Sequence, residues 1–377
     1  MAIGVDGQYL LRFNVGSEED FIDEDDLTEF SLIEEVGNIL PSFQMVFATR
    51  KDNIVGMLSE NNQFKVSFGR DRNSLVDTPL SITTQESSGM GTDKKTLYMS
   101  GLYSALPYMI NSKLSISEEK SAIEVISDVV GTRFITDFNA SNSLDSQRWI
   151  QPNVSDRKFV NEMWLHADLN NSFPAVGISS DGKFILKDIK KRLSSPYDWR
   201  FTKNPDPNSA KDLVFDDDYT TKVSSGFINS IVGYGREKLA YVIEEELSQS
   251  ILKKVDPIVA ITRKIARSEE VEARFAQTAF INDNVHENYW DAFLHNVVHL
   301  IGMGAVKLTF SFQGVYIPIR ILDLVMFRDT SSTDQKETAS HHSGLYFVSK
   351  VARTISNRQF ITVVEVCRES MNELRDA

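Results

Sequence analysis

Short runs in which apolar and polar residues alternate dominate the first 112 residues of the chain. Phe64, Val66 and Phe68, for example, alternate with Lys65 and Ser67, which is the two-residue period of a half-buried strand. Many short strands separated by polar turns predict an all-β barrel or sandwich. The predicted strands are Tyr9–Val15, Glu29–Glu35, Ser42–Ala48, Gln63–Phe68, Ser81–Gln85 and Thr96–Leu106.

From Ser115 the apolar spacing becomes helical. The first predicted helix is capped by Ser117, has acidic residues in its first turn, and ends at Gly131. A second helix begins near Ser155 and Asp156. The apolar residues at helical spacing are Ile123, Ile126, Val129 and Val130 in the first helix and Phe159, Val160, Met163, Trp164 and Ala167 in the second.

Strands are expected around these two helices. One strand, Arg133–Phe138, follows the first helix. A hairpin of Ala175–Ile178 and Phe184–Ile189, turned at Ser180, Asp181 and Gly182, follows the second. Residues 113–191 are therefore predicted to form an α+β insert.

The next segment, residues 192–285, combines a linker with charged sequence. It is rich in Pro, Asn, Asp and Ser as far as Asp218, which is the composition of a linker. Val223–Tyr234 is typical of a strand pair, and we expect this pair to belong to a second barrel. The highly charged part, Glu237–Phe280, has helical character from Ser268 to Ala279.

Residues 286–377 repeat the β-rich pattern after one helix, His286–Ile301. In the last predicted strand, Phe360, Thr362, Val364 and Val366 alternate with a second, largely apolar set, so we expect both of its faces to be covered. The fold class predicted is a β-rich α+β protein with two barrels around the insert. The four strands predicted here are Val306–Phe312, Val315–Leu322, Leu345–Ala352 and Phe360–Cys367.

Composition and charge restrict the function classes. The 377 residues are 41% hydrophobic and 25% charged, as in soluble globular proteins. A formal net charge of -13 opposes a large nucleic-acid interface, although an acidic wall suits a passage for DNA. The opening residues do not resemble a signal peptide. We predict no membrane-spanning segment, because polar residues interrupt the most apolar stretch, Phe293–Phe310.

Histidines supply the first candidate chemistry. His295 and His299 are spaced i, i+4, with Asp291 one turn earlier, so all three lie on one helix face. Asn296 stands where a zinc-peptidase helix has its glutamate, and polar positions on this helix are the simpler interpretation. His341 and His342 lie in a Ser/Thr/Gly-rich stretch and are expected to be exposed loop residues.

Acidic residues and the single cysteine supply the rest. The run Glu18–Asp26 lacks the oxygen ligands and turn glycine of a calcium loop, so a solvated loop is favoured. Asp216, Asp217 and Asp218 are adjacent, which rarely lets carboxylates converge on one bond. Cys367, the only cysteine, excludes an intrachain disulfide and is expected to be a buried thiol. We predict no catalytic, cofactor-binding or metal-binding residues, and no cofactor.

Two stretches resemble a known family. The segments EEKSAIEVISDVVG, RWIQPNVSDRKFVNEMWLHADLNNSFPAV and GISSDGKFILKDI resemble the insert of phage baseplate hub proteins. The segments ENYWDAFLHNVVHLIGMGAVKLTFSF and SGLYFVSKVARTISNRQFITVVEVCRES, with Arg368 near the end of the last strand, resemble the final helix and barrel of those hubs. One departure is Pro318, within the strand that enters the last barrel. The likeness covers about half of the chain by sequence pattern and the rest by element order.

This resemblance implies a structural, non-enzymatic hub subunit of a contractile injection machine. Family members form homotrimers whose two tube-like barrels per subunit make a pseudo-sixfold ring between a hexameric tail tube and a trimeric spike. The implied partners are the central spike protein, the tail tube or tube-initiator proteins, the tape-measure protein and the baseplate wedge proteins, with DNA only in passage. The implied location is the tail baseplate of the virion, after assembly in the host cytoplasm.

Two other function classes remain open. A tail-tip cell-wall hydrolase requires two carboxylates or a metal set in one cleft. A carbohydrate-binding module requires exposed aromatic rings, and the tryptophans that could supply them are Trp149, Trp164, Trp199 and Trp290. Trp164 and Trp290 lie on apolar helix faces and are better assigned to a core.

Overall fold

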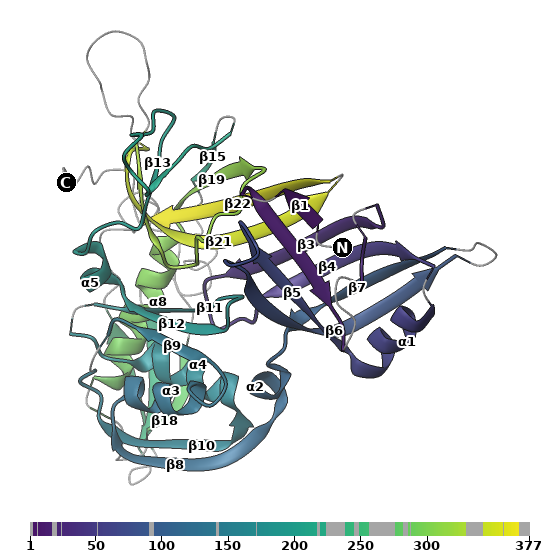
Figure 1. The fold of residues 1–377 in the computed structure, drawn as a ribbon. Helices are drawn as coiled ribbons and strands as arrows, with labels where there is room; N and C mark the ends of the chain where they lie inside the picture. Colours follow the sequence, from purple (N-terminus) through teal and green to yellow (C-terminus); the bar gives the residue numbers. More distant parts are fainter. Residues whose placement is uncertain are drawn as a thin grey trace, which may run out of the picture.

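The computed structural model describes most of the chain. It shows three β-rich units that share one large sheet or pack against it (Figure 1). The described residues are 3–5, 7–16, 21–23, 25–50, 52–89, 94–140, 143–170, 172–216, 219–223, 238–244, 249–255, 276–281, 286, 288–328, 342–356 and 358–368.

The N-terminal unit is a curled antiparallel sheet with the strand order β1-β2-β5-β6-β7-β4-β3. The alternation predicts β2 to β7 but not β1, and β7 ends at Tyr103 instead of Leu106. The buried side chains on one face form an aromatic-rich core that includes Phe13, Phe30 and Phe64. The helix α1 (Asp52–Asn61) was not predicted, although Ile54 and Leu58 are buried one turn apart. The strands are β1 (Ile3–Val5), β2 (Tyr9–Asn14), β3 (Leu27–Glu35), β4 (Ser42–Thr49), β5 (Gln63–Gly69), β6 (Val76–Ser88) and β7 (Lys95–Tyr103).

The α+β insert has its own core, formed where α3 and α4 pack between a three-stranded sheet and a two-stranded ribbon. Figure 1 shows the ribbon, β8–β10, along the outer side of these helices. The three-stranded sheet has the order β11-β12-β9. The short helix α2 (Leu106–Ile110) leads into the insert, whose elements are β8 (Ser112–Lys120), α3 (Ala122–Val130), β9 (Ile135–Phe138), β10 (Gln147–Ser155), α4 (Asp156–His166), β11 (Pro174–Ile178), β12 (Lys183–Asp188) and α5 (Ile189–Leu193).

The first helix of the insert begins four residues later than predicted. Ser117 and its acidic neighbours lie on β8, whereas Ser121 caps α3. The Oγ of Ser121 accepts a hydrogen bond from the Glu124 N–H, and a Glu124 carboxylate oxygen accepts one from the Ser121 N–H at 2.8 Å. This reciprocal capping box satisfies two N–H groups, so it is the stronger start signal. The predicted end at Gly131 and the predicted start of α4 at Ser155 are confirmed.

The C-terminal unit continues the large sheet and contains the helix α8 (Tyr289–Met303). The predicted linker contributes two short strands, because Trp199–Phe201 pairs with β20 and Asp212–Leu213 pairs with Trp199–Phe201. The strands are β13 (Trp199–Phe201), β14 (Asp212–Leu213), β15 (Thr220–Val223), β19 (Val306–Gln313), β20 (Leu324–Phe327), β21 (Gly344–Ser356) and β22 (Gln359–Arg368).

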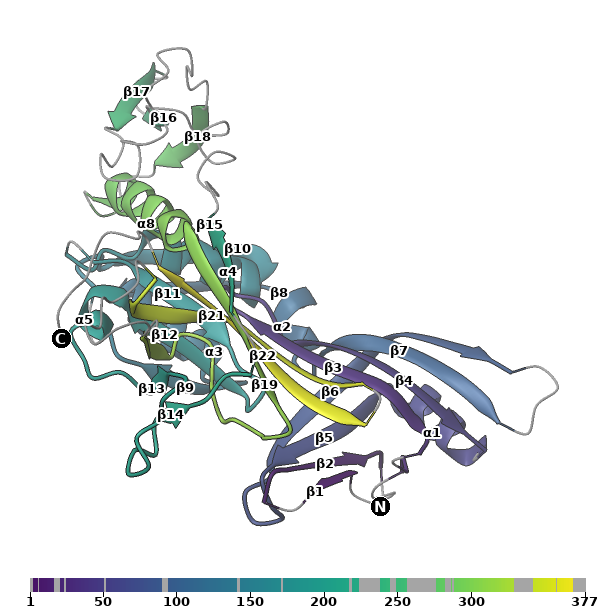
Figure 2. The ribbon, with the colours of Figure 1, turned by 90° about the horizontal axis from the view of Figure 1, so that it is seen from above.

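A small sheet lies beyond α8, as Figure 2 shows. It consists of β16 (Lys238–Glu244), β17 (Gln249–Val255) and β18 (Ala276–Ile281). The predicted helical character is therefore wrong for Ala276 to Ala279, and the rest of that prediction lies outside the described residues. The predicted strand pair Val223–Tyr234 also lies outside them, except for Val223 at the end of β15.

The two halves of the large sheet are joined where β3 pairs antiparallel with β21. Leu32 lies opposite Arg353 and Glu34 opposite Val351 in this pairing, which we call the seam. Among the described residues, 14 strands belong to this one sheet. The seam therefore fixes the N-terminal and C-terminal units relative to each other through main-chain hydrogen bonds.

The strand predicted at Val315–Leu322 does not form, whereas β20 was not predicted. Residues Gly314–Asp323, here called the connector, cross from β19 to β20 without joining a ladder. Pro318 has no N–H to donate, and Leu322 has a positive φ of 65°, so this backbone is unsuited to a central strand. Isolated main-chain hydrogen bonds and the side chain of Arg353 hold the connector instead.

The last strand, β22, has the two faces that its pattern predicts. Phe360, Thr362, Val364 and Val366 are all buried; Phe360 belongs to the core of the N-terminal unit, and Val364 and Val366 belong to that of the C-terminal unit. On the other face, Glu365 is half-buried and pairs with Lys307, Ile361 and Val363 are half-buried, and Cys367 is buried. Both faces are thus covered. Among the described helices, none combines the length and the apolarity that crossing a membrane requires.

Candidate functional site

The histidine pair singled out in the sequence, His295 and His299, lies on the helix α8. The ring centroids of His295 and His299 are 4.5 Å apart, and His299 stacks on Phe173 at 4.9 Å. The side chain of Asp291 lies outside the described part of the chain. Among the described side chains, no three His, Cys, Asp or Glu residues gather in the manner of metal ligands. The geometry of the pair is that of ring packing between two elements.

The acidic run Glu18–Asp26 is described only in part. The Asp26 carboxylate pairs with Lys94 Nζ at 2.6 Å, and Asp25 forms an ion pair with Arg358. These carboxylates contact cations of the protein's own side chains, so the described part of the run has the geometry of a charged surface loop.

The acidic run Asp216–Asp218 and the pair His341 and His342 are each described only in part. The Asp216 N–H donates to the Ser311 carbonyl oxygen at 3.0 Å, while Asp217 and Asp218 lie outside the described residues. His342 is half-buried and accepts a hydrogen bond from the Tyr346 hydroxyl on its carbonyl oxygen at 2.6 Å. This contradicts the exposed position expected for His342, because the turn packs against β21. His341 lies outside the description.

Cys367 is buried, as its apolar strand predicts. Burial raises the pKa of its thiol to about 12, because the charged thiolate is poorly solvated there. A thiol held protonated at neutral pH is a weak nucleophile. The Cys367 side chain therefore serves packing in β22.

The tryptophans whose side chains the structure describes are buried or half-buried. Trp149 and Trp164 are buried in the core of the insert, and the Trp149 indole donates to the Lys120 carbonyl oxygen at 3.0 Å. Trp199 is half-buried and takes part in the polar network described next, while the side chain of Trp290 lies outside the described residues. The described tryptophans form no exposed aromatic platform.

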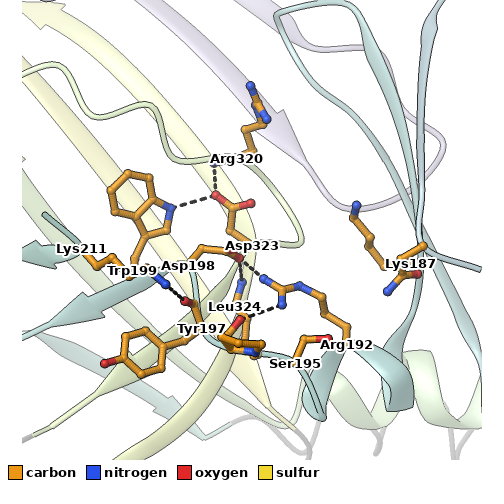
Figure 3. A network of polar contacts seen from close by, with 12 residues as sticks. Lys187, Arg192, Ser195, Tyr197, Asp198, Trp199, Lys211, Arg320, Asp323 and Leu324 are labelled. Atoms are coloured by element: carbon orange, nitrogen blue, oxygen red, sulfur yellow. Dashed lines mark hydrogen bonds and ion pairs between the residues drawn. The ribbon is translucent and has the colours of Figure 1, made fainter.

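A network of polar contacts joins the strand β13 to the end of the connector (Figure 3). The indole N–H of Trp199 and the backbone N–H of Arg320 both donate to Asp323 Oδ2, at 2.9 and 3.0 Å. The neighbouring carboxylate, Asp198, accepts from the Leu324 N–H at 2.8 Å and pairs with Arg192. Together these contacts fix β13 against β20.

The two carboxyl groups of this network differ in electrostatics. Desolvation raises the pKa of Asp323 to about 6, and the negative charge of Asp198 acts in the same direction. A pKa near neutral also suits a general acid or base. Asp323 Oδ2 already accepts hydrogen bonds from two N–H donors of the protein itself. The contacts of Asp323 therefore indicate a structural role in holding β13 against the connector.

A buried ion pair lies at the seam. Arg353 Nη1 is 2.8 Å from Glu34 Oε2, and the two side chains are 4% and 1% exposed. The second carboxylate oxygen of Glu34 accepts the backbone N–H of Ser180, in the turn between β11 and β12. The next residue in that turn, Asp181, pairs with Arg320 of the connector at 3.0 Å. We call these five residues the polar junction.

The same arginine holds the connector. Arg353 Nη2 donates to the Ile319 carbonyl oxygen at 2.7 Å and to that of Ile317 at 3.4 Å. At the other side, the Tyr316 N–H donates to the Gln8 carbonyl oxygen at 2.7 Å. The connector thus contacts the first strands, the seam and the insert, and the polar junction ties three units to one another.

The sequence contains a signal for the polar junction. Glu34 follows Phe30 and Leu32 at the buried positions of β3, and Arg353 lies between Val351 and Ile355 at the buried positions of β21. A charged residue in register with apolar neighbours indicates a buried, paired charge.

Comparison with known proteins shows what this architecture resembles. The sequence matches no protein-family model and no curated protein. The fold is similar to that of a tail protein from Neisseria meningitidis MC58, with a TM-score of 0.59 and 10% identity, over 97% of this chain and 98% of that one. It is also similar to the 43 kDa tail protein of prophage MuSo2 from Shewanella oneidensis, with a TM-score of 0.56 and 9% identity, over 96% and 97% of the two chains.

These matches establish the fold. The chain has the fold of phage tail proteins, β-rich and built on a curled sheet with small helices, as the resemblance predicts. The likeness spans nearly the whole of both chains, so it includes the insert and the seam as well as the sheet halves.

Proposed function

We propose that the protein is a structural, non-enzymatic baseplate hub subunit of a phage tail. It forms a homotrimer in which each chain contributes two tube-like barrels, one from residues 1–112 and one from parts of residues 192–377, around the insert of residues 113–191. The ring adapts a hexameric tail tube to a trimeric spike and lines the central channel. The observation that carries this proposal is the end-to-end likeness to tail proteins, which leaves almost none of either chain unmatched.

The seam supports the proposal of a rigid ring subunit. Two curled half-sheets joined by main-chain hydrogen bonds and a buried ion pair form one stiff body rather than two hinged domains. A subunit between a tube and a spike must keep its two barrels at a fixed angle. A closed ring also covers exposed strand edges, which is a physical reason for the chain to assemble.

The partners follow from this position. The hub contacts the central spike protein on one side and the tail tube or its initiator proteins on the other, while wedge proteins surround it and the tape-measure protein occupies the lumen. The net charge of -13 supports a channel wall that repels DNA phosphates during passage. The proposed location is the tail baseplate of the virion.

The described residues give no specific support to the hydrolase or the carbohydrate-binding alternative. The carboxyl pair nearest to a catalytic arrangement, Asp198 and Asp323, is bonded to donors of the protein itself. Trp149 and Trp164 are buried.

Mass measurement tests the proposal. Light scattering on the chain, alone and coexpressed with its spike, should give three copies per complex with the spike present. Negative-stain images of that complex should show a ring with an open centre. A stable dimer or tetramer in tail particles contradicts the proposal, as does release of peptidoglycan fragments by the purified chain.

A further inference from the structure

The outer face of the β8–β10 ribbon is apolar and exposed. Leu114 and Ile116 on β8 are 74% and 59% exposed, and Ile150 on β10 is 43% exposed. Ile116 lies opposite Ile150, and Leu114 opposite Pro152, so the four side chains form two adjacent cross-strand pairs. An apolar cluster of this kind on a monomer marks a contact surface.

The other face of the ribbon is anchored in the insert. Trp149 is buried there, and Gln151 is fully buried and donates to the carboxylate of Asp156, at the start of α4, at 3.1 Å. The ribbon therefore cannot turn its apolar face inward without removing these two side chains from the core. The exposure of Leu114 and Ile116 belongs to the folded insert.

The main chain of β8 offers an edge as well as a face. Within the described part of the chain, β8 pairs with β10 alone. Pro152 has no N–H, so its pair with Leu114 is of the type without mutual hydrogen bonds, and the alternation of an antiparallel ladder makes the pair of Ile116 and Ile150 the same type. Leu114 and Ile116 consequently direct their N–H and C=O groups away from β10, toward the outer edge.

The charges around this edge neutralise one another. Three cations flank the apolar pairs, and each is matched by a carboxylate of the insert itself. A nucleic acid or a highly charged peptide would have to displace these partners, whereas an apolar strand would not. The ion pairs are Lys113–Asp156 at 2.9 Å, Lys120–Asp128 at 2.6 Å and Arg148–Glu118 at 2.9 Å.

We propose that β8 is an acceptor edge, to which an extended segment of another protein adds as a third strand of the ribbon. Its main chain bonds to Leu114 and Ile116, and its apolar side chains, at every second position, extend the patch formed by these two residues and Ile150. Strand addition uses both features of β8, the free main-chain edge and the apolar face. The inference does not depend on ring assembly, because it concerns the insert alone.

Peptides of defined pattern test this proposal on the full-length chain. The probes are nine-residue peptides with Val, Ile, Leu, Phe or Tyr at alternate positions and Thr or Ser between them. Fluorescence anisotropy measures peptide binding, and amide hydrogen exchange locates it on the chain. Binding peptides should slow exchange at the Leu114 and Ile116 amides by at least tenfold. Ile116→Pro removes an outward N–H and should weaken binding at least tenfold, whereas Ile135→Thr, at an exposed apolar site elsewhere on the insert, should not change it.

Three results would overturn the proposal. The first is a peptide set that leaves the exchange of the Leu114 and Ile116 amides unchanged in the wild-type chain. The second is equal binding by a folded Ile116→Pro variant. The third is a peptide-free dimer that Ile116→Pro dissociates, because the occupant is then a second copy of this chain. The exchange experiment uses the wild-type chain, so it stays decisive if the proline variant does not fold.

Discussion

Glu34 and Asp323 are two carboxylates that the fold removes from solvent in different ways. Glu34 contacts the guanidinium of Arg353 and a backbone N–H, so its negative charge has a full counter-charge within 2.8 Å. Asp323 has two N–H donors and a second carboxylate, that of Asp198, in its surroundings. The first arrangement pairs opposite charges, and the second raises the pKa of Asp323 to about 6.

The difference shows that burial alone does not determine how a charge contributes to stability. A buried ion pair strongly depends on both partners, since the loss of one leaves the other desolvated and unpaired. A carboxyl group such as Asp323, whose desolvation outweighs the nearby charge of Arg320, can instead take up a proton. The seam is therefore expected to depend on the presence of both partners of its ion pair, while the β13 contact depends on pH.

Glu34→Gln should produce the largest loss of stability. The substitution keeps the side-chain volume but leaves the Arg353 charge buried without a counter-charge, at a cost of about 3–5 kcal/mol in the free energy of unfolding. Urea denaturation of the purified variant measures this loss. A loss below about 1 kcal/mol would mean that water or another group solvates Arg353, and the comparison with Asp323 would fail.

The double variant Glu34→Leu with Arg353→Met is the control for that result. It removes both charges together, so it should be more stable than Glu34→Gln by about 2 kcal/mol or more. It should not regain all of the wild-type stability. The Ser180 N–H and the Ile319 carbonyl lose their partners, at about 1 kcal/mol each.

Asp323→Asn should change how stability depends on pH. Because the pKa of Asp323 is about 6 in the folded chain and lower in the unfolded chain, folding binds a proton at this group. Its favourable contribution is complete below about pH 4 and is lost as the pH rises through 6. An asparagine cannot ionise and still accepts hydrogen bonds from Trp199 and Arg320. At pH 7.5 the free energy of unfolding of the variant should therefore exceed that of the wild type by on the order of 2 kcal/mol.

Urea midpoints at pH 4.5, 6.0 and 7.5 measure this difference. The variant and the wild type should have similar midpoints at pH 4.5 and should separate as the pH rises through the pKa of Asp323. Parallel curves at all three values would show that Asp323 is ionised throughout, and that the two donors alone compensate its charge.

The sequence predicts elements whose signals are local. Alternation located most strands of the N-terminal unit, and the serine at position 155 located the start of α4, because strand faces and caps depend on residues close together in the chain. It failed at the first helix of the insert, where Ser117 and Ser121 compete and the reciprocal bond with Glu124 favours the later residue. The prediction also failed at the connector, which is held by isolated main-chain bonds and by Arg353 instead of a ladder.

The candidate chemistry was harder to predict because it depends on contacts between distant segments. Glu34 and Arg353 are 319 residues apart, and only the β3–β21 pairing makes them neighbours. Trp199 lies in a segment whose composition predicted a linker. It meets Asp323 through the parallel pairing of β13 with β20. Among the residues that the sequence did single out, His295 and His299 pack against each other on α8, and His299 stacks on Phe173, since histidine spacing alone does not specify a third ligand.

The smallest effect is expected from Glu35→Gln, one residue away from the largest. Glu35 is on the opposite face of β3 and pairs with Lys350 of β21 at 2.6 Å, so it joins the same two strands as Glu34 does. These two side chains are 44% and 38% exposed, and water solvates each charge when the other is removed. The loss in urea denaturation should therefore be below about 1 kcal/mol and should decrease further in 0.5 M salt. A loss as large as that of Glu34→Gln would show that β3–β21 pairing itself, and not the burial of the charge, determines the sensitivity of the seam.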